Sequence, residues 1–303
     1  MPPKPLLLVI AGPTASGKTG LAIALARHFN TDIINADSRQ IYRELKIGAA
    51  PPAPEELAIA KHHFVAERNL NQAWTAGDFE NEALQRLQNV FQKQNVAILS
   101  GGTGLYIQAL LNGIDTQEAC DPSLREEIAQ WSLAYQLERL GALDPDALSM
   151  IDTANPRRVQ RALELVISQN KPLRAIWQGE PKERPFDAVN FVLDPPSDWL
   201  RERINTRIDF MLAAGLEAEA RALLPYRNHS SMQTVGYQEW FPFFDGNYDR
   251  NEAIQQIRHH TWQYARRQRT WLRNRLQGII IEPLETEARL EIILRHLSDN
   301  HGI

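Results

Sequence analysis

Residues 6–19 read L-L-L-V-I-A-G-P-T-A-S-G-K-T, and this stretch decides the fold. Its first six residues form a short apolar run that ends at Gly12, which is typical of a buried parallel strand. Apolar side chains recur through residues 18–28 as they do in a packed helix. The turn between them satisfies the phosphate-binding pattern G-x-x-x-x-G-K-[ST] with Gly12, Pro13, Thr14, Ala15, Ser16, Gly17, Lys18 and Thr19.

The chemistry of this loop is anion binding. Its glycines let backbone N–H groups converge on an anion, and the helix N-terminus adds a partial positive charge. Lys18 brings a point charge to terminal phosphate oxygens, and the Thr19 hydroxyl suits Mg²⁺. The motif has the strand and helix flanks that the mechanism requires, so we expect a bound phosphate chain.

Further strand and helix patterns follow in alternation. Residues 32–37, 96–99, 190–194 and 278–281 read as strands, and residues 83–94 read as a helix. Strand and helix in this rhythm predict an α/β protein with a doubly wound parallel sheet of the P-loop NTPase type.

The middle of the chain has a different sequence pattern. Residues 122–180 show helical patterns without an intervening strand-like run. We predict a P-loop catalytic core formed by residues 1–114 and 190–303, interrupted by a helical insertion domain over residues 115–189. The alternative is one continuous fold with a helical middle.

Composition sets broad limits. The 303 residues carry a net charge of -4, so overall charge gives no sign of nucleic-acid binding. A single cysteine, Cys120, excludes an intramolecular disulfide and suits a reducing compartment. The apolar run at residues 6–11 is too short for a membrane span or a signal peptide. We therefore expect a cytoplasmic protein without a membrane segment, working as a monomer.

The acid that would complete a nucleotide-hydrolysing site is not where such enzymes place it. The strand at residues 96–99 ends in Ser100-Gly101-Gly102-Thr103, without a carboxylate. Asp194 ends a later strand, but two prolines follow it. Asp37 directly follows the second strand, at the sheet edge where ligands bind in open α/β folds. Asp37 could be a metal ligand, a catalytic base or a helix N-cap.

A second signal lies in residues 258–275, which hold six arginines, two histidines and three aromatic residues. On a helix, Arg266, Arg269 and Arg273 share one face. Such a helix suits nucleic-acid backbones and stacked bases. The alternative is a solvated helix whose tryptophans pack on the core. Arg203 and Arg207, one turn apart, could both point into one cleft.

These motifs together resemble the tRNA dimethylallyltransferase family, also called isopentenyl-diphosphate:tRNA transferases, in its compact bacterial form. The resemblance spans nearly the whole chain, and the order and spacing of the blocks make it specific. Besides the P-loop, the blocks start at Asp37-Ser38-Arg39-Gln40, His62-His63, Thr75-Ala76-Gly77-Asp78, Gly101-Gly102-Thr103-Gly104, Asn155-Pro156-Arg157-Arg158, Gly236-Tyr237-Gln238-Glu239 and Arg267-Gln268-Arg269-Thr270-Trp271.

The resemblance implies transfer of a dimethylallyl group from dimethylallyl diphosphate to the exocyclic N6 amine of an adenine. That adenine lies 3′ of the anticodon in tRNAs reading codons that begin with U. The P-loop would then hold the donor's diphosphate rather than ATP. Lys18, Mg²⁺ held by Thr19, and Arg207 or Arg203 would stabilise the leaving diphosphate. Asp37 would be the general base and Thr103 a second polar contact to the adenine.

The resemblance also implies where the tRNA anticodon stem-loop binds. The adenine must leave the stack of the loop, as for other base-modifying enzymes. The insertion domain would act as a clamp on the RNA, and the arginine-rich helix would hold its backbone. The implied tRNA-binding residues are Asp37, Ser38, Arg39, Gln40, Thr103, Arg125, Gln160, Arg161, Ala162, Leu163, Glu164, Arg266, Arg269 and Arg273.

One segment departs from the family pattern. The family usually has Gly-Thr-Ala-Lys-Pro after the Asp-Ser turn, whereas this chain has Gly48-Ala49-Ala50-Pro51-Pro52. The change removes a hydroxyl and a lysine, which questions any phosphate or RNA contact from this loop. Two rival functions remain at this point: a small-molecule kinase using ATP, and a non-enzymatic RNA-binding protein with a vestigial P-loop.

Overall fold

The structure is a computed structural model that describes residues 4–113, 121–177, 182–282 and 285–303. Cys120 and the predicted boundary at 114/115 lie outside the described residues. The chain divides into two compact units, residues 1–111 with 184–303 and residues 112–183. None of the described helices is long and apolar enough to cross a membrane.

The first unit is built on one six-stranded sheet, in which every strand pair is parallel and the order is β3-β2-β4-β1-β5-β6. This confirms the predicted α/β class. The strands are β1 (Leu6–Ala11), β2 (Ile33–Ala36), β3 (His62–His63), β4 (Val96–Gly101), β5 (Asp187–Leu193) and β6 (Ile279–Ile281).

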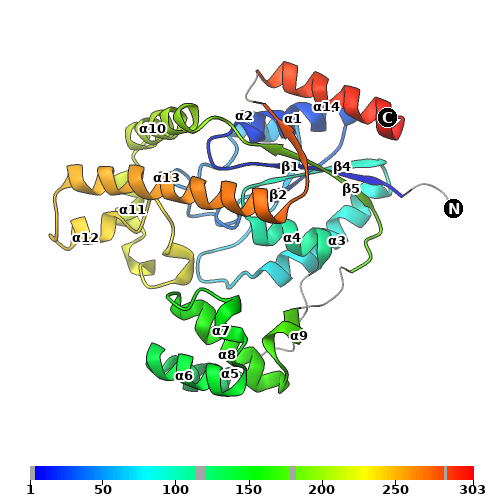
Figure 1. The fold of residues 1–303 in the computed structure, drawn as a ribbon. Coiled ribbons are helices and arrows are strands. Elements are labelled where there is room, and N and C mark those ends of the chain that lie inside the picture. Colours follow the sequence, from blue (N-terminus) through cyan, green and yellow to red (C-terminus); the bar gives the residue numbers. More distant parts are fainter. Residues whose placement is uncertain (1–3, 114–120, 178–181, 283–284) are drawn as a thin grey trace. The chain divides into compact units, whose positions relative to one another are not determined.

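Helices cover both faces of this sheet (Figure 1). On one face lie α1 and α14, and on the other lie α3 and α4. The helices of the first unit are α1 (Lys18–Phe29), α2 (Pro54–Ile59), α3 (Ala76–Phe91), α4 (Gly104–Asn112), α10 (Ser197–Ala213), α11 (Leu216–Ala222), η1 (Leu224–Tyr226), η2 (Ser230–Met232), α12 (Trp240–Phe244), α13 (Arg250–Arg275) and α14 (Thr286–His301).

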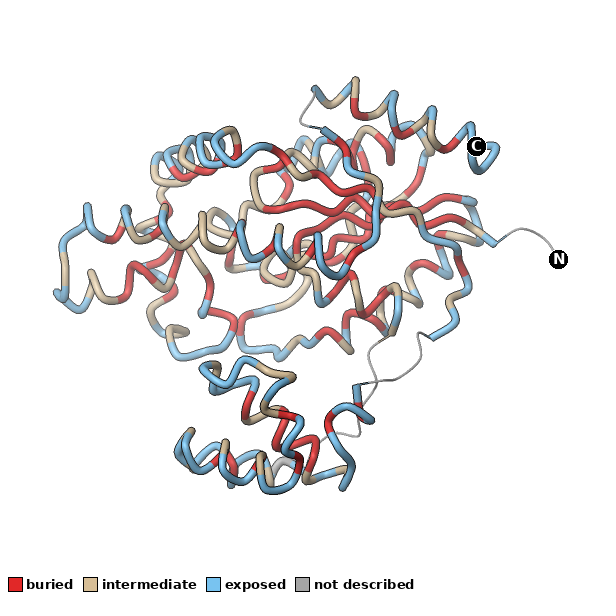
Figure 2. The backbone as a smooth tube through the Cα atoms, viewed as in Figure 1, coloured by how far each residue is buried: buried red, intermediate tan, exposed pale blue. Residues whose placement is uncertain are grey.

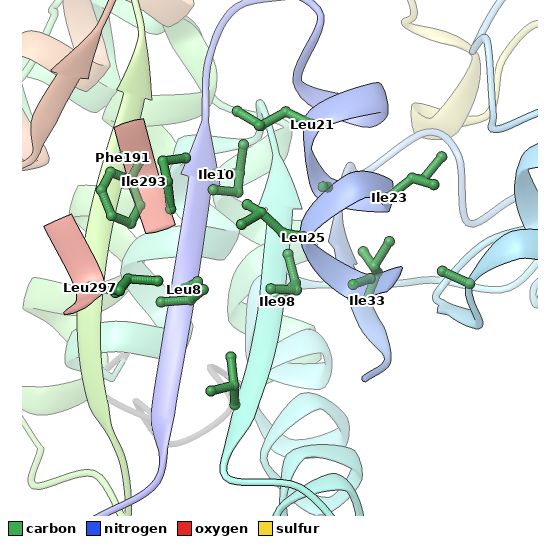
Figure 3. Close-up of a cluster of buried hydrophobic side chains, with 14 of the residues drawn as sticks. Leu8, Ile10, Leu21, Ile23, Leu25, Ile33, Ile98, Phe191, Ile293 and Leu297 are labelled. Atoms are coloured by element: carbon green, nitrogen blue, oxygen red, sulfur yellow. The ribbon is translucent and has the colours of Figure 1, made fainter. Parts of the chain in front are cut away.

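The main core lies between the sheet and the helix pair α1 and α14. Figure 2 shows the central strands as a continuous buried layer, and β1 is buried along its whole length. Figure 3 shows Leu8 and Ile10 of β1 between Leu25 of α1 and Leu297 of α14. Burial on both faces explains why these strands are continuously apolar rather than alternating.

The starts of two predicted elements were wrong, and one strand was missed. The helix expected over residues 83–94 begins seven residues earlier, at Ala76, because Thr75 and Asp78 cap each other's backbone N–H groups. The strand β5 begins at Asp187, inside the segment predicted to be insertion. The two-residue strand β3 was missed because so short a run has no periodicity to read.

The second unit consists of helices around their own core. Ile128, Leu140, Leu163 and Leu173 are fully buried in it. Its helices are α5 (Pro122–Ala129), α6 (Leu133–Leu143), α7 (Ala147–Met150), α8 (Pro156–Gln169) and α9 (Leu173–Trp177).

Candidate active site

The P-loop joins the end of β1 to the start of α1. Gly17 is the N-cap of α1 and has a φ of 87°, a left-handed conformation that favours glycine. Two cations hold carbonyl groups of the loop. Lys18 Nζ donates to Pro13 O at 3.0 Å, and Arg203 Nε of α10 donates to Ala15 O at 3.1 Å.

Helix α13 fastens this loop to the neighbouring strand end. The Thr14 N–H donates to Gln268 Oε1 at 2.9 Å, and Gln268 Nε2 donates to Gly102 O at 2.9 Å. Gln268 is buried, with 7% of its surface exposed. The sequence reasoning missed this residue. The sequence feature that could have indicated Gln268 is its uncharged amide between two arginines, Arg267 and Arg269.

Asp37 follows β2 and serves both as a cap and as an open carboxylate. Its Oδ1 accepts hydrogen bonds from the backbone N–H groups of Arg39 (2.9 Å) and Gln40 (3.3 Å). Within the described parts of the chain, no hydrogen bond reaches Oδ2, and Asp37 lines the central cavity. The two readings of Asp37, cap and reactive carboxylate, are therefore compatible.

Thr103 lies beside the Asp37 turn. Its Oγ1 accepts the Ser38 N–H at 3.1 Å, and its own N–H donates to Ala36 O at 3.1 Å. Tyr264 of α13 also belongs to this corner and was missed from the sequence. Burial, aided by the charge of Asp37, raises the pKa of the Tyr264 phenol to about 12, so it stays protonated and can donate.

The positive end of the site is formed by Lys18 and Arg207. Arg207 Nη1 donates to Thr14 Oγ1 at 3.2 Å, and Nη2 donates to Ala50 O at 3.3 Å. Burial, aided by the charge of Arg207 and opposed by that of Asp37, lowers the pKa of Lys18 from 10.5 to about 8. Burial likewise lowers the pKa of Arg207. A bound polyanion would relieve this cost.

Lys18, Asp37, Arg207, Tyr264 and Gln268 line one cavity of about 480 Å³, whose lining does not include Thr103 or Arg203. Thr14 and Thr19 of the P-loop region belong to its polar lining. Its apolar lining consists of Ile204, Ile208, Met211, Val235 and Ile257. The cavity thus suits a ligand with a charged phosphate head and a short hydrocarbon body.

The segment that departs from the family pattern borders this cavity through Gly48 and Ala49. Glu219 of α11 accepts hydrogen bonds from the backbone N–H groups of residues 46–48. The Tyr237 hydroxyl accepts the Gly48 N–H at 2.9 Å and donates to Glu219 Oε1 at 2.6 Å. A Cβ at Gly48 would lie 2.5 Å from the Tyr237 ring, so glycine is required there.

The oxygen ligands of the site suit a magnesium ion. The Thr19 hydroxyl and the Asp37 carboxylate both line the cavity, and both are hard oxygen ligands. Mg²⁺ needs only one or two protein ligands when substrate phosphates and water supply the rest. Among the described residues there is no cluster of three or more His, Cys, Asp or Glu that could hold a metal by itself.

The arginines proposed on α13 do not act as one surface. Arg269 Nε and Arg273 Nη2 both pair with Asp194, at 2.6 Å each, which explains the acid at the end of β5. Arg266 is exposed, whereas Arg267 lines the cavity. The face of α13 turned to the cavity instead carries Ile257, Thr261, Tyr264 and Gln268.

The implied RNA contacts of the second unit lie on α5 and α8. Ala162 and Leu163 are fully buried in the core of this unit, so their side chains do not face a partner. Glu164 is also buried and pairs with Arg161 (3.1 Å) and Arg125 (3.4 Å). Gln160 Nε2 donates to Glu164 Oε1 at 3.1 Å. Arg125, Gln160 and Arg161 are the members of this group with exposed surface.

The chain is similar in sequence to a known family of transferases. A family model described as IPP transferase matches residues 40–275. A tRNA dimethylallyltransferase from Cytophaga hutchinsonii is 45% identical over 269 residues, which are 88% of this chain and 88% of that protein. A second one, from Flavobacterium psychrophilum, is 39% identical over 298 residues, which are 95% of this chain and 97% of that protein.

Solved structures show the same likeness. The tRNA isopentenylpyrophosphate transferase from Bacillus halodurans superposes with a TM-score of 0.74 at 30% identity, covering 98% of this chain and 96% of its own. A eukaryotic dimethylallyltransferase, described as acting on tRNA, has a TM-score of 0.81 at 23% identity, covering 98% of this chain and 77% of its own. The second likeness concerns the fold alone.

Proposed function

Because the chain belongs to the tRNA dimethylallyltransferase family, we propose that it transfers a dimethylallyl group from dimethylallyl diphosphate to the N6 amine of an adenine in tRNA. The adenine is the one adjacent, on the 3′ side, to an anticodon that reads codons beginning with U. The observation that carries the proposal is the cavity, whose lining combines the P-loop and Arg207 with the apolar side chains of Ile204, Ile208 and Met211. A kinase needs no such hydrocarbon wall beside its P-loop.

The donor's diphosphate would lie on the P-loop and its five-carbon chain along Ile204, Ile208 and Met211. As the bond between C1 of the allyl group and the bridging oxygen breaks, negative charge grows on the diphosphate. Lys18, Arg207 and the loop N–H groups would stabilise this charge. When bound, Mg²⁺ would add Lewis-acid stabilisation to the diphosphate and would be held by Thr19.

On the acceptor side, the adenine amine attacks C1 and must lose one proton. Asp37 Oδ2 would take that proton during the attack, since a carboxylate is too weak a base to remove it beforehand. Oδ1 is held by the N–H groups of Arg39 and Gln40, so the carboxylate is fixed in direction. Thr103 and Tyr264 would bind the edge of the adenine.

We propose that the anticodon stem-loop contacts Arg39 and Arg267, which line the cavity, and the exposed Arg266. In the second unit, Arg125, Gln160 and Arg161 would contact RNA, while Glu164 orients them. We propose that the protein acts as a monomer in the cytoplasm, where its tRNA substrate is found.

The test is label transfer from radiolabelled dimethylallyl diphosphate to an anticodon stem-loop in the presence of Mg²⁺. The wild-type protein should label the RNA, and Asp37→Asn should slow transfer by about 10²- to 10⁴-fold without weakening RNA binding. The asparagine side chain retains an oxygen that can cap the turn, so the variant removes the base alone. Asp249→Asn is the matched control, because Asp249 caps α13 in the same way. Hydrolysis of ATP without labelled RNA would refute the proposal.

A further inference from the structure

Helix α14 places an arginine where its sequence pattern calls for an apolar residue. Arg289, Ile293 and Leu297 recur every four residues and form the buried stripe of this helix. Their exposed fractions are 3%, 0% and 0%. A fully buried arginine is rare without a paired carboxylate. Its position therefore requires an explanation beyond packing.

The guanidinium of Arg289 lies against the back of the P-loop. Its Nη1 donates to Ser16 O at 3.2 Å, and a Cβ on Gly17 would lie 2.8 Å from the same nitrogen. Among the described residues Arg289 forms no ion pair, and its Nε is buried without a hydrogen-bond partner. Burial and the charge of Arg203 lower the pKa of Arg289, and the charge of Glu285 opposes them only in part, so this cation is under-compensated.

The hydrogen bond to Ser16 O fixes the direction of a peptide group. In a trans peptide the C=O of one residue and the N–H of the next point to opposite sides. Holding the Ser16 carbonyl toward α14 therefore turns the Gly17 N–H away from α14. Lys18 and Arg203 hold the carbonyls of Pro13 and Ala15 in the same manner. Cations thus occupy three carbonyl groups of the loop. The N–H groups of Thr14 and Ser16 are bonded to Gln268 Oε1 and Pro13 O, which leaves the Gly17 N–H for an anion.

We propose that Arg289 is a positioning residue of the diphosphate site, supplied by the C-terminal helix. It holds the Ser16–Gly17 peptide so that the Gly17 N–H addresses the diphosphate, and the bound anion compensates its buried charge. This inference rests on the proposed function, because it takes the P-loop ligand to be the donor's diphosphate.

The test is binding of inorganic pyrophosphate to the full-length protein by titration calorimetry, together with KM for dimethylallyl diphosphate. Arg289→Met should raise the pyrophosphate Kd and the donor KM about tenfold, as expected for one charge-assisted contact. KM for the RNA should not change. Arg289→Lys keeps the charge and should restore part of the affinity.

Two controls separate positioning from folding. Arg295→Met removes an exposed arginine of the same helix and should leave the pyrophosphate Kd unchanged. Leu297→Ala removes a buried member of the same stripe and should lower stability without changing Kd. Equal binding by Arg289→Met and wild type, or equal weakening by Leu297→Ala, would overturn the inference. If the wild-type protein itself binds no pyrophosphate, it is the proposed function that fails.

Discussion

Replacing Lys18 by methionine should make the unliganded protein more stable at pH 7, although it removes a residue that we propose for the diphosphate site. Burial lowers the pKa of Lys18 from 10.5 to about 8, so the folded state holds its charge at a cost of roughly 3 kcal/mol. Methionine also removes the hydrogen bond to Pro13 O, which is worth about 1 kcal/mol. The expected net gain in the free energy of unfolding is about 2 kcal/mol.

The size of this stability gain depends on pH between about 8 and 10.5. Below pH 8 the lysine is protonated in both states, so the full cost is present in the wild-type protein. Between about 8 and 10.5 the folded state has lost the proton and the unfolded state retains it, so wild-type stability rises with pH. The advantage of Lys18→Met should therefore be complete at pH 7 and close to zero at pH 9.5.

Urea unfolding of both proteins at pH 7 and 9.5 measures this difference, since groups common to both cancel. Lys93→Met, which removes an exposed lysine after α3, is the control and should give no gain. Pyrophosphate should invert the order, because at 100 times its Kd it stabilises the wild type by about 2.7 kcal/mol and the variant far less. A Lys18→Met protein that is less stable at pH 7, or equally favoured at both pH values, would refute the reasoning.

Two further substitutions probe how the cavity is supported. Gln268→Glu keeps the shape of the side chain but sets a carboxylate oxygen against Gly102 O. It should therefore lower the free energy of unfolding in urea by about 2 kcal/mol and raise the donor KM. Unchanged values would show that Gln268 does not hold the P-loop to Gly102. Tyr237→Phe removes the hydroxyl that joins the Gly48 N–H to Glu219. It should lower the free energy of unfolding by about 1–3 kcal/mol and speed hydrogen exchange of the Gly48 amide. Exchange at the wild-type rate would contradict this expectation.

The parts of the fold that could be predicted are those with local patterns. The first strand, the P-loop and α1 follow one another within residues 6–29, and each has its own signature. The start of α3 was missed because its cap, formed by Thr75 and Asp78, precedes the apolar periodicity by about two turns. The edge strand β3 exists because β2 pairs with it, which no local pattern reports.

The site residues that could be predicted are likewise those with a local pattern. Lys18 and Asp37 could be placed because the end of a neighbouring parallel strand fixes their position. Gln268 and Tyr264 could not, because their role depends on how α13 passes over strands far away in the sequence. The same helix shows which of its arginines have partners within the chain. Arg269 pairs with Asp194, 75 residues distant, and only the fold reveals such a partner.

Helix α10 shows how a common phosphate loop can serve prenyl transfer. Ile204, Arg207, Ile208 and Met211 all line the cavity, and their spacing of three and four places them on one face of this helix. Arg207 contacts the P-loop through Thr14 Oγ1, while the apolar members of the stripe form the hydrocarbon wall. In the proposed function, one helix would therefore set the distance between the diphosphate and the allyl chain. The reactive C1 would lie where these two parts of the lining meet, so selectivity for a short prenyl donor would depend on α10 as much as on the P-loop.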